Sequence, residues 1–315
     1  MVLLGLDLGG ATVPWHSPIV LSLVLLGVLT LVLFIIIEYK FAAHPIMPLS
    51  RILTAHSNNA ATLLVCTAHG ICYISVAYFL PLYFQSVLGF SPIVSGIWSL
   101  AMAGTLLLTT LCCGAYMHAT GRYVEIIFFG FGFLVLGFGL FTTLPATLSV
   151  PRVVLFQIAI CLGIGALLQP PLVALQAHLE PADMATGTAT FGFVRMLSAG
   201  FSIVIGQVIF QGGMRGRFGE FVAAGIAPDV AQRLADGSSI TGGTGSGEGL
   251  TEMQMEMVRG AQAHSLSRMW IFYTIVAALG LLAGFGIRRK EMSRLHVEMK
   301  TGLESMTSRE ASTSE

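Results

Sequence analysis

The chain has 315 residues, of which 55% are hydrophobic and only 10% are Asp, Glu, Lys or Arg. Soluble domains usually contain about 25% charged residues. The 16 basic and 16 acidic residues balance, which excludes a basic nucleic-acid-binding protein and an acidic disordered protein. With a mean hydropathy of +0.81, the composition predicts a chain that lies mostly in lipid. We therefore expect the bilayer, and no nucleic acid, among its partners.

Long stretches without charge divide the chain into predicted spans. A bilayer core of about 30 Å requires roughly 20 apolar residues in a helix, and lipid offers no hydrogen-bond partner to an exposed backbone. The uncharged stretch between Arg51 and Arg122 contains two spans, separated by a turn signal at 89–92. The sequence predicts an all-α polytopic membrane protein with about seven spans, at 18–37, 60–84, 92–116, 126–144, 153–176, 186–211 and 269–287.

The distribution of basic residues predicts the orientation of these spans. Most of them flank one side of the spans, including a cluster after residue 287, and basic residues favour the cytoplasmic side. The N-terminus is then outside and the C-terminus cytoplasmic, in the plasma membrane or, as an alternative, the vacuolar membrane. The expected regions are an extracytoplasmic segment 1–17, a helix 18–37, a cytoplasmic loop 38–59, a six-span domain 60–287 with an extracytoplasmic loop 212–267, and a cytoplasmic tail 288–315.

Two ionisable residues lie in the middle of predicted spans, where a charge is costly unless it has a partner or a function. Arg195 lies in the sixth span and His69 in the second. The arginine keeps its charge and can hold carbonyls, stack on aromatic rings or face an anionic ligand, whereas the histidine can carry a coupling proton. The structural alternatives are an arginine that snorkels or bonds between helices, and a neutral histidine bonded to a neighbouring helix.

Uncharged polar residues also fall in the spans, where they must bond across helices or line a wet cavity. They are Tyr73, Tyr78, Tyr83, Gln85, Gln157, Gln169, Gln176 and Gln207. The pair Pro170-Pro171 interrupts the fifth span and predicts a kink or gate there. Glycines within the spans, such as Gly280 and Gly284, predict close helix packing.

The sequence contains no P-loop, HExxH or GxSxG motif, so we predict no enzyme. The cysteines all lie in predicted spans, so no structural disulfide is expected in an outer loop. They are Cys66, Cys72, Cys112, Cys113 and Cys161, and their spacing does not fit zinc ligation. We therefore expect neither a metal ion nor a cofactor.

Short strings, in order along the chain, resemble a known family. They are Gly10 to Pro18, Tyr78 to Gln85, Gly89 to Pro92, Gly121-Arg122, Gly163 to Gln176, Phe193 to Arg195, and Ala263 to Leu266 with Trp270. In this combination the chain resembles the C-terminal half of a fungal major facilitator superfamily exporter, of the 14-span drug:proton antiporter family. The resemblance covers nearly the whole chain. It implies that the last six spans form one domain of two inverted three-helix repeats.

The resemblance also implies a function. Residues 1–17 would hold the remnant of a preceding span and 18–37 a linker helix, and the N-terminal six-helix domain of the family is missing. The implied activity is export of a small amphipathic toxin, drug or secondary metabolite by proton antiport. Arg122 would help a cytoplasmic gate, and His69 is the candidate for proton coupling. The implied substrate-binding residues are Tyr73, Tyr83, Gln157, Gln169 and Arg195.

Several alternatives stay open from the sequence. Alternating access requires two domains around a central site, so the chain is either a truncated and inactive half or the partner of a separate N-terminal half. A siderophore or other small-molecule importer of the same superfamily shares these helices. A seven-span receptor shares the topology, but the long loop at 212–267 and the lack of outer-loop cysteines disfavour it.

Overall fold

The computed structural model describes residues 1, 4–5, 16–40, 57–147, 149–180, 183–236 and 250–289. These parts of the chain are helical and contain no β-strand. The helices are α2 (Pro18–Lys40), α4 (Ser57–Leu82), the π-helix η1 (Tyr83–Val87), α5 (Pro92–Thr120), α6 (Val124–Phe141), α7 (Val150–Ala166), α8 (Pro170–Gln176), α9 (Met184–Arg215), α10 (Phe218–Ala223), α11 (Pro228–Ala235) and α12 (Glu252–Gly284). Most of the loop predicted at 38–59 and nearly all of the tail predicted at 288–315 lie outside the described residues.

Six helical segments are long and apolar enough to cross a membrane. They are Asn58–Val87, Pro92–Thr120, Val124–Phe141, Val150–Gln176, Met184–Ala223 and Glu252–Gly284, and each overlaps one of the spans predicted after residue 59. The first predicted span, at 18–37, lies on α2, which contains a shorter apolar stretch, Pro18–Phe34. The predicted all-α fold class is confirmed.

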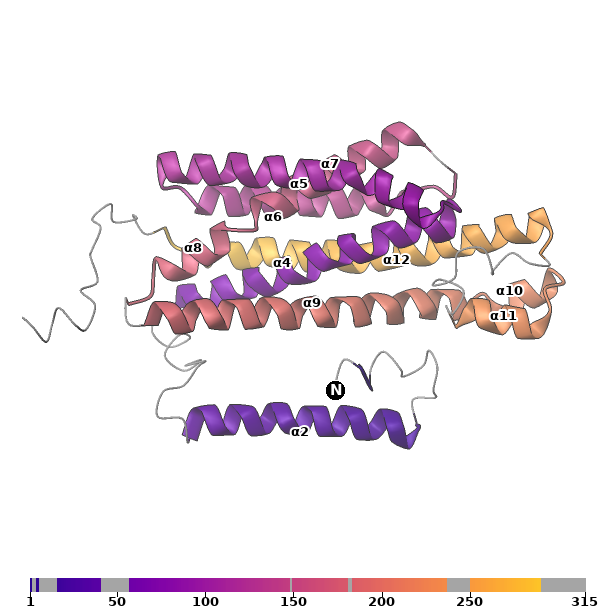
Figure 1. Cartoon of the computed structure of the whole chain (residues 1–315), viewed down its shortest axis with the longest axis horizontal. Coiled ribbons are helices and arrows are strands. Elements are labelled where there is room, and N and C mark those ends of the chain that lie inside the picture. Colours follow the sequence, from indigo (N-terminus) through magenta and orange to yellow (C-terminus); the bar gives the residue numbers. More distant parts are fainter. Residues whose placement is uncertain are drawn as a thin grey trace, which may run out of the picture.

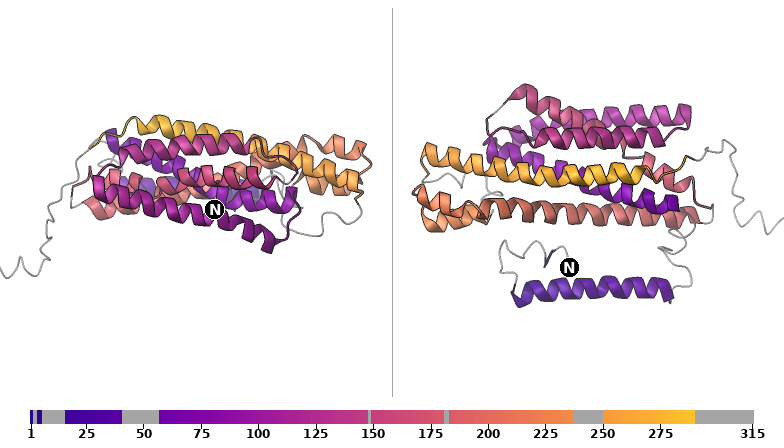
Figure 2. Two further views of the ribbon diagram at one scale, coloured as in Figure 1. Left: turned by 90° about the horizontal axis from the view of Figure 1, so that it is seen from above. Right: turned by 180° about the vertical axis from the view of Figure 1, so that it is seen from behind.

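The long helices lie side by side in one bundle, and α2 lies along α9 at its edge (Figure 1, Figure 2). Helix α4 packs on α9 and α12. In the same way, α7 packs on α5 and α6. The third helices of the two sets, α6 and α12, pack on each other. The first helix of each set, α4 or α7, thus packs on the two later long helices of the other set, where the sets are α4, α5, α6 and α7, α9, α12. Two three-helix repeats produce this pattern.

Glycines allow the backbones of α6 and α7 to touch. A Cβ atom added to Gly163 would lie 2.7 Å from the Gly130 carbonyl oxygen and 2.7 Å from the Leu134 nitrogen. A Cβ at Gly137 would lie 2.7 Å from the Cα atom of Ile160. Small residues permit this approach, which in lipid replaces the hydrophobic effect as the source of helix packing.

An aromatic cluster fills the bundle between α4, α6 and α12. Its members are Phe79, Phe138, Phe141, Trp270 and Tyr273, and each is at most 1% exposed. The Tyr273 hydroxyl donates to the Ser202 carbonyl at 2.8 Å, and the Ser202 hydroxyl donates to the Ile71 carbonyl at 2.7 Å. These bonds connect α12, α9 and α4 and satisfy hydroxyl groups that have no access to water.

Much of the predicted loop at 212–267 is helical. Helix α12 begins at Glu252, well before its predicted span, and Thr251 and Gln254 cap it with reciprocal side-chain bonds to backbone N–H groups. Charged residues such as Arg268 end an apolar window but do not end a helix. Hydropathy therefore places the start of this helix too late, while the centre of the loop, at 237–249, lies outside the described residues.

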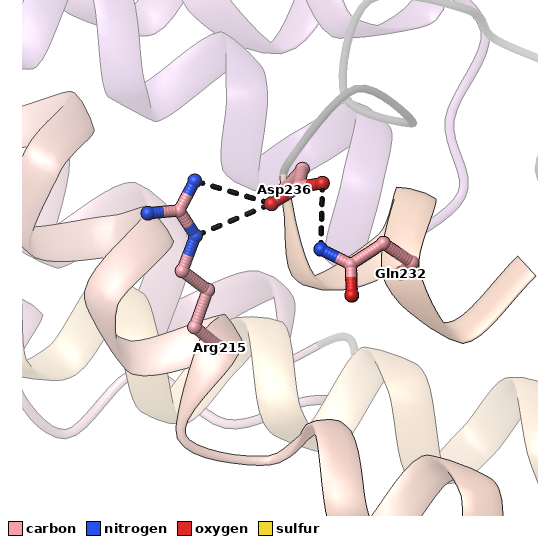
Figure 3. Close-up of polar contacts among 3 residues, drawn as sticks. All are labelled: Arg215, Gln232 and Asp236. Carbon is pink, nitrogen blue, oxygen red and sulfur yellow. Dashed lines mark hydrogen bonds and ion pairs between the residues drawn. The ribbon is translucent and has the colours of Figure 1, made fainter. Parts of the chain in front are cut away.

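An ion pair joins the end of α9 to the end of α11. Arg215 donates through Nε and Nη2 to Oδ1 of Asp236 at 3.2 and 3.1 Å, and Gln232 donates to Oδ2 at 2.9 Å (Figure 3). An exposed pair of this kind contributes at most about 1 kcal/mol. Phe221 and Leu234 are buried and join the core of the bundle, so apolar contact holds these short helices in place.

The close approach of α6 and α7 predicts unequal effects of adding one methyl group. Gly163→Ala should lower the free energy of unfolding by about 1–3 kcal/mol, because the new Cβ meets backbone atoms that cannot move aside. The matched control is Gly139→Ala, where a Cβ has no neighbour within 4 Å. Thermal unfolding of the purified protein in detergent measures both. Equal midpoints for the two variants would contradict this packing.

Candidate functional site

The span that contains α7 and α8 is interrupted. Helix α7 ends at Ala166, and α8 begins at Pro170 after three non-helical residues, 167–169. Pro170 and Pro171 have no N–H group, so the carbonyls of Ala166 and Leu167 lack the donor that a continuous helix would give them. The kink predicted from the proline pair is therefore a complete break, which we call the α7–α8 break.

Side chains from three other helices donate to carbonyls at the α7–α8 break. His69 Nε2 of α4 bonds to the Ile164 carbonyl at 3.2 Å, where only the ring can donate. Thr110 of α5 donates to the Gly165 carbonyl at 3.2 Å. Arg195 Nη1 of α9 donates to the Leu168 carbonyl at 3.4 Å. The break is thus the point at which α4, α5, α7 and α9 are joined by polar contacts.

The two ionisable residues of this site lie close together. A Cβ atom added to Gly70, beside His69, would lie 3.0 Å from the Arg195 carbonyl oxygen, so the backbones of α4 and α9 nearly touch here. The His69 ring is 2% exposed and stacks on Tyr73, with ring centroids 6.2 Å apart. The Arg195 guanidinium is near enough to the His69 ring to interact with it electrostatically. A change of charge on either group therefore acts on the other.

The two predicted glutamines differ in environment. Gln169 lies in the α7–α8 break, and its side chain is exposed. Gln157 of α7 is fully buried, and neither polar atom of its amide has a hydrogen-bond partner among the described residues. A buried amide without a partner costs roughly 1–3 kcal/mol, and sites of this kind require an explanation such as a bound molecule. Gln176, nearby on α8, donates to the Thr188 hydroxyl of α9 at 3.0 Å.

Two other predicted residues lie away from the α7–α8 break. The hydroxyl of Tyr83, in η1, donates to the Pro145 carbonyl at 2.7 Å, and the residue is 1% exposed. Tyr83 lies about 21 Å along the helix from His69 at 1.5 Å per residue. Arg122 follows α5 at the opposite end of the bundle and forms an exposed ion pair with Glu125 at 3.8 Å. The structure therefore groups His69, Tyr73, Gln169 and Arg195, and separates Tyr83 and Arg122 from them.

Thr110 is a residue of the site that the sequence did not indicate. Its single hydroxyl hydrogen is shared between the Gly165 carbonyl and the Leu106 carbonyl of its own helix, which lies at 2.8 Å, as threonines in apolar helices usually bond. Only the register of α5 against α7 brings it to Gly165. No cluster of three or more potential metal ligands among His, Cys, Asp and Glu occurs in the described part of the chain.

The fold and the α7–α8 break define a helical membrane protein with an interrupted span, an architecture that secondary transporters use at their binding sites. No model of a protein family matches the chain. Over 304 residues, 96% of its length, it is 37% identical to the efflux pump dotC of Dothistroma septosporum. It is 36% identical over 303 residues to the MFS-type transporter ppz2 of Metarhizium majus, and 25% identical over 292 residues to the MFS acetylaranotin efflux transporter ataA of Aspergillus terreus.

Over 96% of its length the chain is therefore homologous to fungal MFS-type transporters, and the resemblance drawn from its sequence is confirmed. It is a multi-pass membrane protein, and its relatives are transporters rather than enzymes. The chain spans about half the length of the curated relatives it matches, with 51% of dotC and 52% of ppz2 covered.

The bond from Thr110 to the α7–α8 break predicts a loss of stability when it is removed. Thr110→Val keeps the branched shape but loses the donor, and should cost about 0.5–1.5 kcal/mol. Thr105→Val is the matched control, because Thr105 donates only to Ala101 of its own helix. Thermal unfolding in detergent compares the two. A larger loss in Thr105→Val than in Thr110→Val would show that the bond between α5 and α7 is unimportant.

Proposed function

We propose that the chain forms the C-terminal half of an efflux transporter that exports a small amphipathic compound in exchange for protons. The observation that carries this proposal is the α7–α8 break, where a histidine and an arginine from two different helices bond to carbonyls of an interrupted span. Charged groups in the middle of a membrane are costly and are kept where substrates or protons pass. Two of the relatives, dotC and ataA, are named as efflux proteins.

The proposed substrate face includes Tyr73, Gln157, Gln169 and Arg195. The amide of Gln157 has no hydrogen-bond partner among the described residues, and the side chain of Gln169 is exposed within the break. Both therefore have donors and acceptors to offer. Tyr83 is left out of this face because its hydroxyl is already bonded to the Pro145 carbonyl. Aromatic, amide and guanidinium groups together fit a compound with a flat apolar body and polar substituents.

His69 is the proposed proton carrier. Its Nε2–H group donates to the Ile164 carbonyl, and a proton added to the other ring nitrogen would place a positive charge beside Arg195. Two like charges in a medium of low dielectric constant repel each other. Protonation would therefore push Arg195 from the Leu168 carbonyl and loosen the α7–α8 break. Proton binding and movement of this segment are coupled in this way.

In the proposed orientation, the C-terminus is cytoplasmic and the N-terminus lies outside. Arg122 then lies on the cytoplasmic side, in the turn between α5 and α6. That turn is sharp because Gly121 adopts a φ of 69°, a conformation that favours glycine. The exposed Arg122 is available to a second domain at this end, consistent with a role in a cytoplasmic gate.

Flux measurements test the proposal. Because alternating access requires two domains, they use the purified full chain reconstituted in liposomes together with a separate N-terminal half. An amphipathic fluorescent dye is enclosed, a pH gradient is imposed, and dye and proton movement are followed together. We expect dye to move against the direction of protons, and a protonophore to stop it. Movement of dye and protons in the same direction would identify an importer instead. No dye movement in any gradient would contradict the proposal for this chain.

Replacement of the mid-membrane arginine should abolish transport. Arg195→Ala removes the charge that faces substrate and break, and we expect dye flux to fall at least about 100-fold, which corresponds to about 2.7 kcal/mol. Insertion and folding, measured by membrane yield and thermal unfolding, should stay close to wild type. Arg268→Ala, at an exposed arginine of α12, is the matched control. Unchanged flux in a well-folded Arg195→Ala protein would assign Arg195 a purely structural role.

Replacement of the buried histidine should change the pH dependence of transport. In His69→Ala, the group proposed to take up the proton is absent, so dye flux should lose its dependence on pH. The measurement is the initial rate of dye movement at each pH, with no gradient and with a fixed gradient. His264→Ala, at an exposed histidine of α12, is the control. A pH profile identical to wild type would remove His69 from the coupling.

A further inference from the structure

The charge of Arg195 is only partly compensated within the described part of the chain. A guanidinium has five N–H donors, yet Arg195 forms one hydrogen bond, from Nη1 to the Leu168 carbonyl at 3.4 Å. Charge-assisted bonds of this type are usually about 2.7–2.9 Å long. The carbonyls at the end of α7 supply roughly half an elementary charge at most. Arg195 is half-buried, and most of its donors have no bond to the part of the chain that the structure describes.

The helices that contribute to the α7–α8 break offer no carboxylate at the depth of Arg195. The residue lies about 17 Å along α9 from Met184, at 1.5 Å per residue. The sequence contains no Asp or Glu between Asp183 and Glu220, which lie at the two ends of this segment. Helices α4, α5, α7 and α8, which contribute to the α7–α8 break, contain no acidic residue. The counter-ion of Arg195 must therefore come from outside these helices.

We propose that the transported compound carries an anionic group, a carboxylate or an ionised phenol, and that Arg195 binds this group after leaving the Leu168 carbonyl. This inference rests on the proposed function as a transporter and adds the chemical class of its substrate. A carboxylate accepts two parallel bonds from one guanidinium, so it replaces one long bond with two short ones and neutralises the charge.

The same exchange connects substrate binding to the α7–α8 break. When Arg195 turns to the anion, the Leu168 carbonyl loses its donor, next to two carbonyls that the proline pair already leaves without donors. Of the side-chain bonds described at the α7–α8 break, only those from His69 and Thr110 to the end of α7 then remain. An anionic compound therefore loosens the break as it binds, whereas a neutral compound of the same shape leaves Arg195 on its carbonyl.

Binding of a matched pair of probes to the full chain in lipid nanodiscs tests this inference. The probes are 2-naphthoate and 2-naphthamide, which share one ring system and differ in charge. The proteins are wild type, Arg195→Gln, Arg195→Lys and the control Arg268→Gln, and affinities are measured by calorimetry near pH 7.5. We expect wild type and Arg268→Gln to bind the naphthoate about 10- to 100-fold more tightly than the naphthamide.

The variants at position 195 separate the possible results. Arg195→Gln should bind both probes equally, and Arg195→Lys should keep part of the preference, because lysine retains the charge but not the paired donors. A preference that survives in Arg195→Gln would overturn the inference. Equal binding of both probes to wild type would also overturn it but leave the transporter function intact, with the counter-ion then supplied by another polypeptide. Binding of neither probe to wild type would contradict the proposed function as well.

Discussion

In a membrane, every backbone carbonyl without a donor must find one inside the protein, because lipid supplies none. The pair Pro170-Pro171 removes two donors within the apolar span Val150–Gln176, so two carbonyls of this span lack the donors that a continuous helix would give them. His69, Thr110 and Arg195 reduce the cost by donating to neighbouring carbonyls of the same segment. A histidine and an arginine that would otherwise be unfavourable in lipid are thereby stabilised. The interrupted span and the two ionisable side chains therefore stabilise each other.

The helix packing places these donors. Gly70 lets α4 approach α9 beside Arg195, and at Gly165 an added Cβ would lie 2.9 Å from the Leu106 carbonyl of α5. Gly163 does the same for α6 and α7. Close helix contacts therefore surround the α7–α8 break. Away from it, the aromatic cluster around Trp270 keeps α4, α6 and α12 together. A rigid frame around one weak segment is suited to a domain that changes shape in a defined place.

Much of this arrangement could be predicted from the sequence, and the exceptions have physical reasons. Arg195, His69 and the proline pair stand out because charges and missing N–H groups are rare in apolar spans. Thr110 does not stand out, because its neighbours on α5 include other threonines and only the register against α7 selects it. Nor could hydropathy reveal that Tyr83 bonds to Pro145, since that contact depends on how the turn between α6 and α7 returns to η1.

The central claim is that side chains of α4 and α9 hold the α7–α8 break. Hydrogen–deuterium exchange of the segment 163–176, followed by mass spectrometry on the purified chain, tests it most directly. When His69→Ala and Arg195→Ala are combined, amide exchange should rise in this segment and stay at wild-type rates in α6 and α12, because only the break loses its donors. Exchange in 163–176 that is the same in both proteins would contradict the account.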